Sequence, residues 1–207
     1  MKKRTREILE RLRAANPDAK SELKYSSVYE LAVAVILSAQ CTDKRVNEVT
    51  PKLFELADTP QKMLELGIEK LEEIIHPCGF FRAKAAHIMG MSLALVENYG
   101  GNVPADFDEL QKLPGIGRKT ANVIMAVGFN QPAIAVDTHV FRVSNRLGIV
   151  NEKDVLKTEL ALRKEIDKKL WADAHHWILL HGRYVCKSQK PRCENCIVSD
   201  LCEKRIK

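Results

Sequence analysis

The chain has 207 residues, of which 45% are hydrophobic, and its 33 lysines and arginines outnumber its 27 aspartates and glutamates, for a formal net charge of +6. This length supports a well-buried core in one domain or two small ones. No apolar run reaches transmembrane length, and the basic N-terminus leads into an amphipathic pattern, so we expect a cytosolic protein without a membrane span or secretory signal. The positive balance suits a polyanionic partner, although it is also common in soluble proteins.

Helical periodicity and capping signals run through the whole chain. An amphipathic pattern ends before Asn16-Pro17, Ser27 and Glu30 form a capping box, Thr59-Pro60 is a helix start, and a long helix closes at Gly100-Gly101. Pro51 should kink or interrupt the helix in which it lies. Helices are therefore predicted over 4–15, 28–39, 43–56, 60–66, 68–75, from about 84 to 99, 106–113, from 118, and over 155–184. The fold class is all-α.

The segment Leu113-Pro114-Gly115-Ile116-Gly117-Arg118-Lys119 predicts a tight hairpin between two helices. Glycine allows a tight turn and a close approach of the backbone to a ligand. The free amides of the hairpin and of the next helix start make a simple anion site, best suited to phosphate. Such a turn is also common as a plain connector.

Lys119 falls in the first turn of the second hairpin helix. A helix N-terminus disfavours added positive charge, and the neighbouring Arg118 disfavours it further. An amine that is neutral part of the time can act as a nucleophile. For an arbitrary lysine at a helix start, phosphate binding or simple solvation is the more ordinary role.

Asp137 follows the apolar run 133–136 and stands where a new helix begins. Its ordinary role is that of an N-cap carboxylate. A capping carboxylate is held rigid and ionised, so the same side chain can also face a developing cation.

The tail contains four cysteines in a C-x6-C-x2-C-x5-C pattern: Cys186, Cys193, Cys196 and Cys202. Zinc sites commonly use two close pairs of cysteines, and this pattern has only one close pair, so an iron–sulfur cluster fits at least as well. Spacing alone leaves zinc and iron–sulfur equally placed, and disulfides are a weaker alternative in a cytosolic protein.

Three parts of the sequence together resemble the endonuclease III family. They are the hairpin segment continued to Asn122, the segment Val136-Asp137-Thr138-His139-Val140 up to Arg142, and the four-cysteine tail. This family contains bifunctional DNA glycosylases and abasic-site lyases of the helix-hairpin-helix superfamily. The resemblance extends from about Tyr25 to Cys202, with the motifs in the same order and at similar gaps. It implies a [4Fe–4S] cluster on the four cysteines, with Lys119 as the nucleophile and Asp137 as its catalytic partner.

The resemblance also implies a set of DNA contacts. Gln40 fills the gap left by an extruded nucleotide, and Phe80, where the family usually has leucine, is a wedge in the base stack. Its neighbour Phe81 is expected in the core, and Cys78 is expected as a small buried residue. Phosphate contacts are expected from the hairpin and the cysteine loop: Gly115, Gly117, Arg118, Lys187, Lys190 and Arg192. Ser38, Asp43 and His139 are weaker candidates for a base pocket.

The resemblance further implies that the chain divides into two helical domains that flank a DNA-binding cleft. One spans 21–130 and includes the helix-hairpin-helix at 106–128; the other joins 1–20 to 131–207 and holds the cluster. The partner is double-stranded DNA with oxidised or ring-saturated pyrimidines or abasic sites, and the protein is expected to be a monomer in the cytoplasm, associated with the nucleoid through DNA.

Two other functions remain open at this stage. A monofunctional glycosylase, such as the related mismatch adenine glycosylase, lacks the hairpin lysine and has a catalytic glutamate where this chain has Val35. A non-catalytic DNA-binding module would use the hairpin for phosphate and the cysteines for a structural metal. Trapping a covalent adduct with abasic DNA distinguishes both from a lyase.

Overall fold

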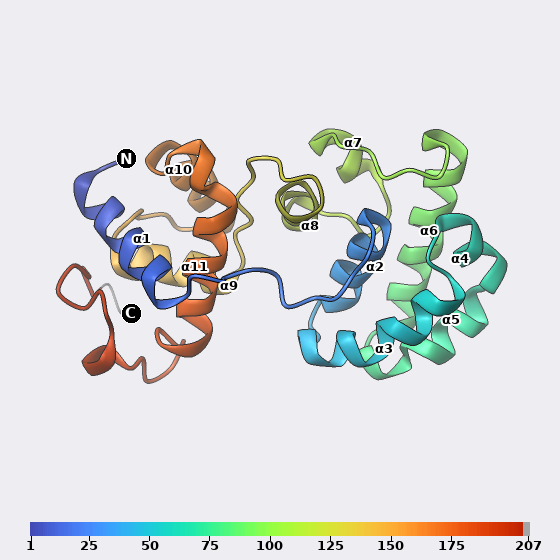
Figure 1. Ribbon diagram of the computed structural model, residues 1–207, viewed down its shortest axis with the longest axis horizontal. Helices are drawn as coiled ribbons and strands as arrows, with labels where there is room; N and C mark the ends of the chain where they lie inside the picture. The colour runs from blue at the N-terminus through green and yellow to red at the C-terminus, as the bar shows by residue number, and fades with distance from the viewer. Residues whose placement is uncertain (205–207) are drawn as a thin grey trace. The chain divides into compact units, whose positions relative to one another are not determined.

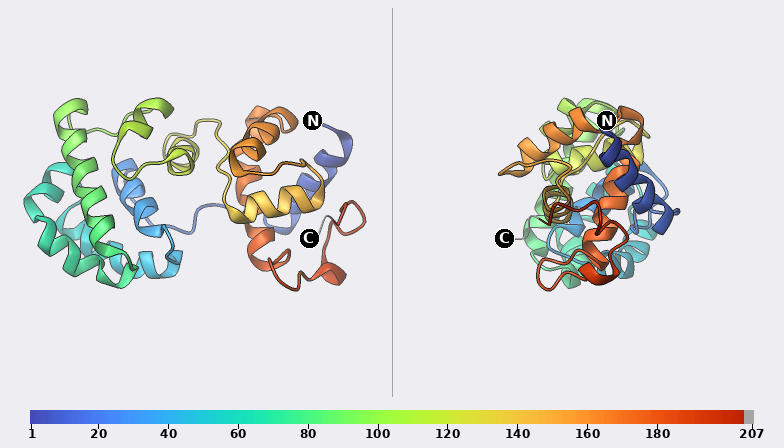
Figure 2. Two further views of the ribbon diagram at one scale, coloured as in Figure 1. Left: turned by 180° about the vertical axis from the view of Figure 1, so that it is seen from behind. Right: turned by 90° about the vertical axis from the view of Figure 1, so that its left-hand side faces the viewer.

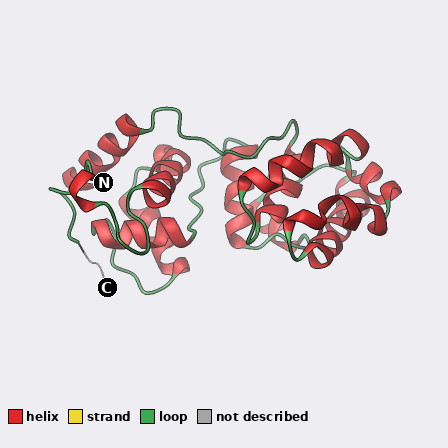
Figure 3. Cartoon of the chain, turned by 90° about the horizontal axis from the view of Figure 1, so that it is seen from below, coloured by secondary structure: helices red, strands yellow, loops and turns green. Residues whose placement is uncertain are grey.

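The computed structural model describes residues 1–204, and over that range it contains helices and loops but no strand (Figure 3). The predicted all-α fold class is confirmed. None of the helices in this range is both long and apolar enough to cross a membrane. The chain divides into two compact units (Figure 1). We call Glu22–Phe129 the hairpin unit, and Met1–Ser21 together with the chain from Asn130 onward the cysteine unit.

The hairpin unit is a bundle of helices around one apolar core, in which leucines, isoleucines and methionines such as Leu37, Met63 and Ile88 are fully buried. Burial of each such side chain stabilises the fold by about 1.5–3 kcal/mol. Its elements are α2 Val28–Ser38, α3 Asp43–Leu56, α4 Pro60–Leu66, α5 Ile68–Ile75, the 3₁₀ turn η1 His76–Cys78, α6 Phe81–Tyr99, α7 Phe107–Lys112, α8 Arg118–Val123 and the π-turn η2 Ile124–Gly128.

Local sequence signals account for most of these helix ends. The side chains of Ser27 and Thr59 accept hydrogen bonds from the amides three residues later, as N-caps do. Gly100, with φ +57°, ends α6, the longest helix within residues 1–204 (Figure 2). Pro51 lies inside α3, which continues to Leu56, so an interruption is wrong and a kink stays a prediction.

The cysteine unit has its own core, to which α1 contributes Ile8, Leu9 and Leu12. Its elements are α1 Lys3–Ala15, α9 Thr138–Leu147, α10 Val155–Glu165, the 3₁₀ turn η3 Lys168–Leu170, α11 Trp171–Tyr184 and the 3₁₀ turn η4 Cys193–Asn195. The single helical pattern expected over 155–184 is therefore two helices, because the chain is extended at Ile166 before η3 begins.

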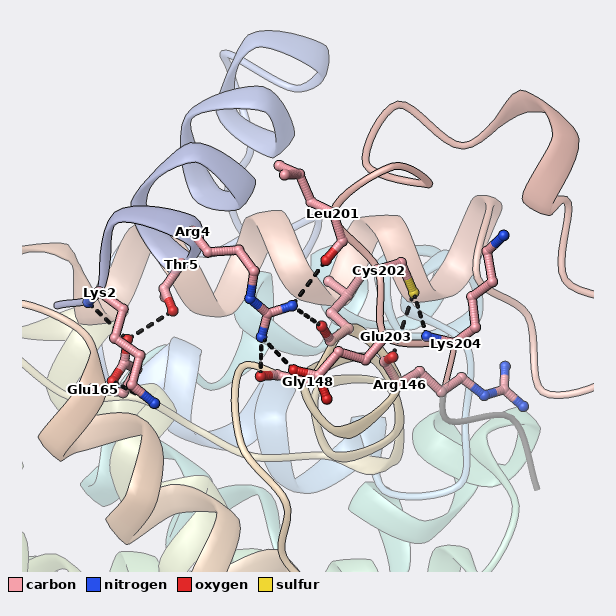
Figure 4. Close-up of polar contacts among 11 residues, drawn as sticks. Lys2, Arg4, Thr5, Arg146, Gly148, Glu165, Leu201, Cys202, Glu203 and Lys204 are labelled. Atoms are coloured by element: carbon pink, nitrogen blue, oxygen red, sulfur yellow. Dashed lines mark hydrogen bonds and ion pairs between the residues drawn. The ribbon is translucent and has the colours of Figure 1, made fainter.

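Arg4 attaches the N-terminal helix to residues far along the chain (Figure 4). Its guanidinium donates to Leu147 O at 2.9 Å and Leu201 O at 2.8 Å, and also to the carbonyl of Gly148. It pairs with the Glu203 carboxylate at 2.8 Å. One side chain on α1 therefore satisfies carbonyls at the end of α9 and in the cysteine tail.

The Arg4→Met substitution should destabilise the protein by about 2 kcal/mol, because it leaves backbone carbonyls without a charged donor. The melting temperature should fall by roughly 4–8 °C for a chain of this size. Arg6→Met, on the exposed side of the same helix, is the matched control and should stay within about 0.5 kcal/mol. Equal losses in the two variants would contradict the role assigned to Arg4.

Candidate active site and cysteine cluster

The hairpin is held by short polar contacts on one side and apolar anchors on the other. The Asp106 carboxylate accepts hydrogen bonds from the amides of Asp108 and Glu109, both at 2.9 Å, and so caps α7. The amide of Ile116 donates to Leu113 O at 3.1 Å, and both of these side chains are buried. The predicted hairpin and the predicted start of its second helix at Arg118 are both present.

The two hairpin glycines differ in what surrounds them. Gly115 has φ +78°, and a Cβ there would lie 2.8 Å from the Cβ of His87 on α6. Gly90, one turn further along α6, lies against the Pro114 ring. A Cβ on Gly117 would meet no protein atom within 4 Å. The protein itself therefore requires glycine at 115, whereas the space beside Gly117 is open to a ligand.

Lys119 is exposed and lies in the first turn of α8. The guanidinium of Arg118 lies over the Phe107 ring, 5.1 Å from its centroid, which links the two hairpin helices through a cation–π contact. The N-cap of α8 is Gly117, with no side-chain cap hydrogen bond. The start of a helix with an N-cap of this kind suits an anion, here beside the lysine.

Asp137 is the N-cap of α9 in the cysteine unit. One carboxylate oxygen accepts from the amide of Val140 at 2.8 Å, and the side chain is half-buried. The capping role expected for this residue is confirmed. The carboxylate has a fixed position at the helix entrance, where the helix dipole favours its negative charge.

Gln40 and Phe80 occupy two turns of the hairpin unit, and both have left-handed backbones, with φ of 52° and 47°. Gln40 is exposed, and 69% of Phe80 is exposed. Phe81 packs against the core and Cys78 is 2% exposed, as predicted for these two residues. A large exposed aromatic on a rarely adopted backbone conformation contributes little to the fold itself.

The three base-pocket candidates lie in different units. In the hairpin unit, Ser38 ends α2 and donates to Val35 O at 2.8 Å, and Asp43 begins α3. In the cysteine unit, His139 lies on α9, with its Nδ1 atom 3.2 Å from a guanidinium nitrogen of Arg142.

All four tail cysteines are free thiols that line one cavity together with Arg146 and His181. The His181 ring approaches Cys196 Sγ at 3.5 Å. The amide of Lys204 donates to Cys202 Sγ at 3.3 Å (Figure 4). Burial, followed by the charges of the other tail thiols, raises the pKa of Cys196 and of Cys202. A positively charged centre in the cavity would remove that mutual repulsion and favour the thiolates.

Within residues 1–204, no three cysteine, histidine or carboxylate side chains converge on a point that could hold a single metal ion. Four cysteine thiols that line one cavity are the donor set that an iron–sulfur cluster uses. The donor set and the cavity therefore agree with an iron–sulfur centre.

Two arginines of α9 hold the basic loop 187–192 that follows the first cysteine. Arg146 is buried and donates to Lys187 O at 2.6 Å and Ser188 O at 2.9 Å. Arg142 donates to Cys186 O at 3.1 Å, and burial lowers its pKa. Sequence reasoning did not assign these roles; the available signal was a pair of arginines four residues apart on a helix with a strong apolar face.

Structurally, these features define a class: an all-α helix-hairpin-helix protein with a C-terminal cysteine domain for an iron–sulfur cluster. The chain belongs to the HhH-GPD superfamily of base excision DNA repair proteins, which residues 33–168 match. Residues 186–202, which include all four tail cysteines, match the iron-sulfur binding domain of endonuclease III. The predicted family and iron–sulfur cofactor are confirmed.

Individual relatives are similar over nearly the whole chain. Endonuclease III of Haemophilus influenzae is 50% identical over 201 residues, which cover 97% of this chain and 95% of that protein. Endonuclease III of Escherichia coli K12 is 48% identical with the same coverage. A solved structure of a trapped endonuclease III–DNA covalent intermediate is 46% identical with a TM-score of 0.93, and the match covers 99% of this chain and 97% of that one.

The hairpin glycines should respond differently to alanine. Gly115→Ala should destabilise the protein by about 1–3 kcal/mol, because the positive φ and the contact with His87 are both unfavourable to a Cβ. Gly117→Ala, with free space and a negative φ, should cost less than about 1 kcal/mol. Melting temperatures of the two variants provide the comparison, and a larger loss for Gly117→Ala would show that the hairpin is built differently.

Proposed function

We propose that this protein is a bifunctional DNA glycosylase and abasic-site lyase of the endonuclease III type. It excises oxidised or ring-saturated pyrimidines from duplex DNA and then cleaves the abasic strand by β-elimination. The observation that carries the proposal is the exposed Lys119 in the first turn of α8, directly after the open hairpin, in a member of a base excision repair family. The solved covalent endonuclease III–DNA intermediate supports the covalent step.

Lys119 is assigned the nucleophilic step. Its neutral amine attacks C1′ of the damaged nucleotide, the new C–N bond forms as the bond to the base breaks, and the base leaves with the electron pair and takes up a proton. Opening of the sugar ring then gives a Schiff base between the lysine nitrogen and C1′. The imine acidifies the C2′ hydrogens, and loss of one of them expels the 3′ phosphate.

Asp137 is assigned electrostatic stabilisation of the same step. Positive charge develops on the sugar as the base departs, and an ionised carboxylate in a fixed position stabilises it without reorganising. The N-cap hydrogen bond to Val140 holds one of its oxygens, which supports this role. The carboxylate can also accept a proton from Lys119.

DNA contacts are assigned to both units. The hairpin at Gly115, Gly117 and Arg118 binds a phosphate, while Gln40 and Phe80 fill the stack vacated by the flipped nucleotide. The exposed cations of loop 187–192, namely Lys187, Lys190 and Arg192, bind further phosphates, so affinity should fall steeply with salt. Ser38, Asp43 and His139 are assigned to base selection.

The iron–sulfur cluster, [4Fe–4S] by resemblance, is assigned to Cys186, Cys193, Cys196 and Cys202. Such a centre gathers the tail, which has few apolar residues, and supplies a rigid frame for the basic loop. Arg146 and Arg142 already hold the start of that loop against α9. We further propose that the protein acts as a monomer on double-stranded DNA in the cytoplasm, at the nucleoid.

Lys119→Gln should abolish the covalent adduct that borohydride traps on DNA containing an abasic site, because no primary amine remains to form the imine. Adducts are measured by denaturing gel electrophoresis. Lys112→Gln is the matched control: this exposed lysine of the same hairpin is paired with Glu109 at 2.6 Å, and its loss should leave trapping intact. Cluster-loaded parent protein that gives no adduct would rule out the lyase.

Asp137→Asn should lower the rate of base release by about 100-fold or more, because the charge that faces the developing cation is lost. Asparagine is as good an N-cap as aspartate, so stability should change little. Asp154→Asn, at the N-cap of α10, is the matched control and should change neither rate nor affinity. If Asp137→Asn weakened DNA binding as much as it slowed the reaction, Asp137 would be a cap alone.

A further inference from the structure

Two exposed side chains of the hairpin unit require an unusual backbone. Gln40 has φ 52° in the turn between α2 and α3, and Phe80 has φ 47° in the turn between η1 and α6. Ordinary side chains rarely adopt this left-handed region, and such residues persist only where the surrounding structure determines them. Glycine adopts this conformation without strain, but the residues at these two positions are glutamine and phenylalanine. The structure around each turn must therefore stabilise these two conformations.

Lys84 lies directly between these turns. Its side chain is on α6 and the residue is only 4% exposed, which is unusual for lysine. The ammonium group donates to Leu37 O at 2.8 Å and to Cys78 O at 2.7 Å. The main-chain amide of the same residue donates to Phe80 O at 3.1 Å. One residue therefore contacts the chain three residues before Gln40, two residues before Phe80, and at Phe80 itself.

Both carbonyls that receive the ammonium belong to helix ends. Leu37 is in the last turn of α2, where the amide of Cys41 donates to Ser38 O and not to Leu37 O. Cys78 is the last residue of η1. Carbonyls at helix C-termini carry partial negative charge, so a cation placed between two of them is favoured by both.

Burial of this amine is unfavourable in itself. Burial lowers the pKa of Lys84, and the nearby thiols of Cys41 and Cys78 act in the opposite direction. A charged group is kept in a core only where good hydrogen bonds offset its desolvation, and an apolar side chain often serves stability equally well. The two carbonyls that accept from the ammonium offset its desolvation and also tie Lys84 to both turns.

We propose that Lys84 is a positioning residue that fixes the distance between the Gln40 turn and the Phe80 turn, so that both side chains enter the DNA stack together. This inference rests on the proposed function of those two side chains. Lys84 itself lies inside the core and has no contact with DNA or with the reacting atoms in this assignment. It acts only through the two turns.

A double-mutant cycle on the full-length, cluster-loaded protein tests the proposal. The variants are Lys84→Met, which keeps the volume and removes the donors, and Phe80→Ala, singly and together. Tyr29→Phe is the matched control, because it also removes a buried polar group from the same core: the Tyr29 hydroxyl is hydrogen-bonded to Ser92 on α6 at 2.7 Å. Readouts are the bend of a dye-labelled duplex with an abasic-site analogue, measured by energy transfer, and the single-turnover rate of base release.

Phe80→Ala should slow base release about tenfold in the parent chain and reduce the bend, but should cost less than about twofold when Lys84 is already methionine. In the Tyr29→Phe background the full tenfold loss should remain. Affinity for undamaged DNA should be the same in the Lys84→Met and parent proteins, because the phosphate contacts are elsewhere. Equal losses from Phe80→Ala in all three backgrounds would overturn the proposal.

Two other results of this experiment, a variant that does not fold and a loss of the stack-filling role, can be told apart. If Lys84→Met does not fold, Lys84→Leu, which also lacks a donor, replaces it in the same cycle with the same criteria. If Phe80→Ala and Gln40→Ala both leave rate and bend unchanged in the parent chain, the positioning role is overturned along with the stack-filling role. Adduct formation through Lys119 would then still show that the lyase proposal stands.

Discussion

Helix ends are the physical constraint on which this structure depends. Every α-helix leaves its first amides and last carbonyls without partners inside the helix, and each of these groups must find one or remain in water. The described part of the chain consists of helices and loops, so this requirement recurs throughout it. Asp137 satisfies the start of α9, and Lys84 satisfies the ends of α2 and η1.

The way in which an end is satisfied decides what it can do. A side chain that caps an end, as Asp106 and Asp137 do, becomes rigid and keeps its charge at a fixed position. The start of α8 is different, because Gly117 offers no side chain to its first amides and leaves space beside them. An end of this kind is suited to an external anion. A helix start with a side-chain cap and one without are thus suited to opposite chemical uses.

Local signals explain what the sequence could predict. Caps at Ser27, Thr59 and Asp106 act within a few residues, so the helix starts could be read directly, and the hairpin is specified by its own glycine and proline. The roles of Lys84 and Arg146 could not be predicted from the sequence, because their partners lie far along the chain or in a loop without periodicity. On α6, Lys84 has the ordinary appearance of a lysine at a helix start, and only tertiary contacts show that it is buried.

The positive charge of the tail is the last constraint, and the proposed cluster would offset part of it. Loop 187–192 contains three cations, and its first carbonyls are held by a fourth, the buried Arg146. Four neutral thiols would leave this positive charge unbalanced in one short segment. A 2+ iron–sulfur core on four thiolates contributes −2, which lowers the formal net charge of the protein from +6 to +4. In the proposed assignment, the cluster offsets the charge of the basic loop, and affinity for DNA comes from such local patches and not from the net charge of the whole chain.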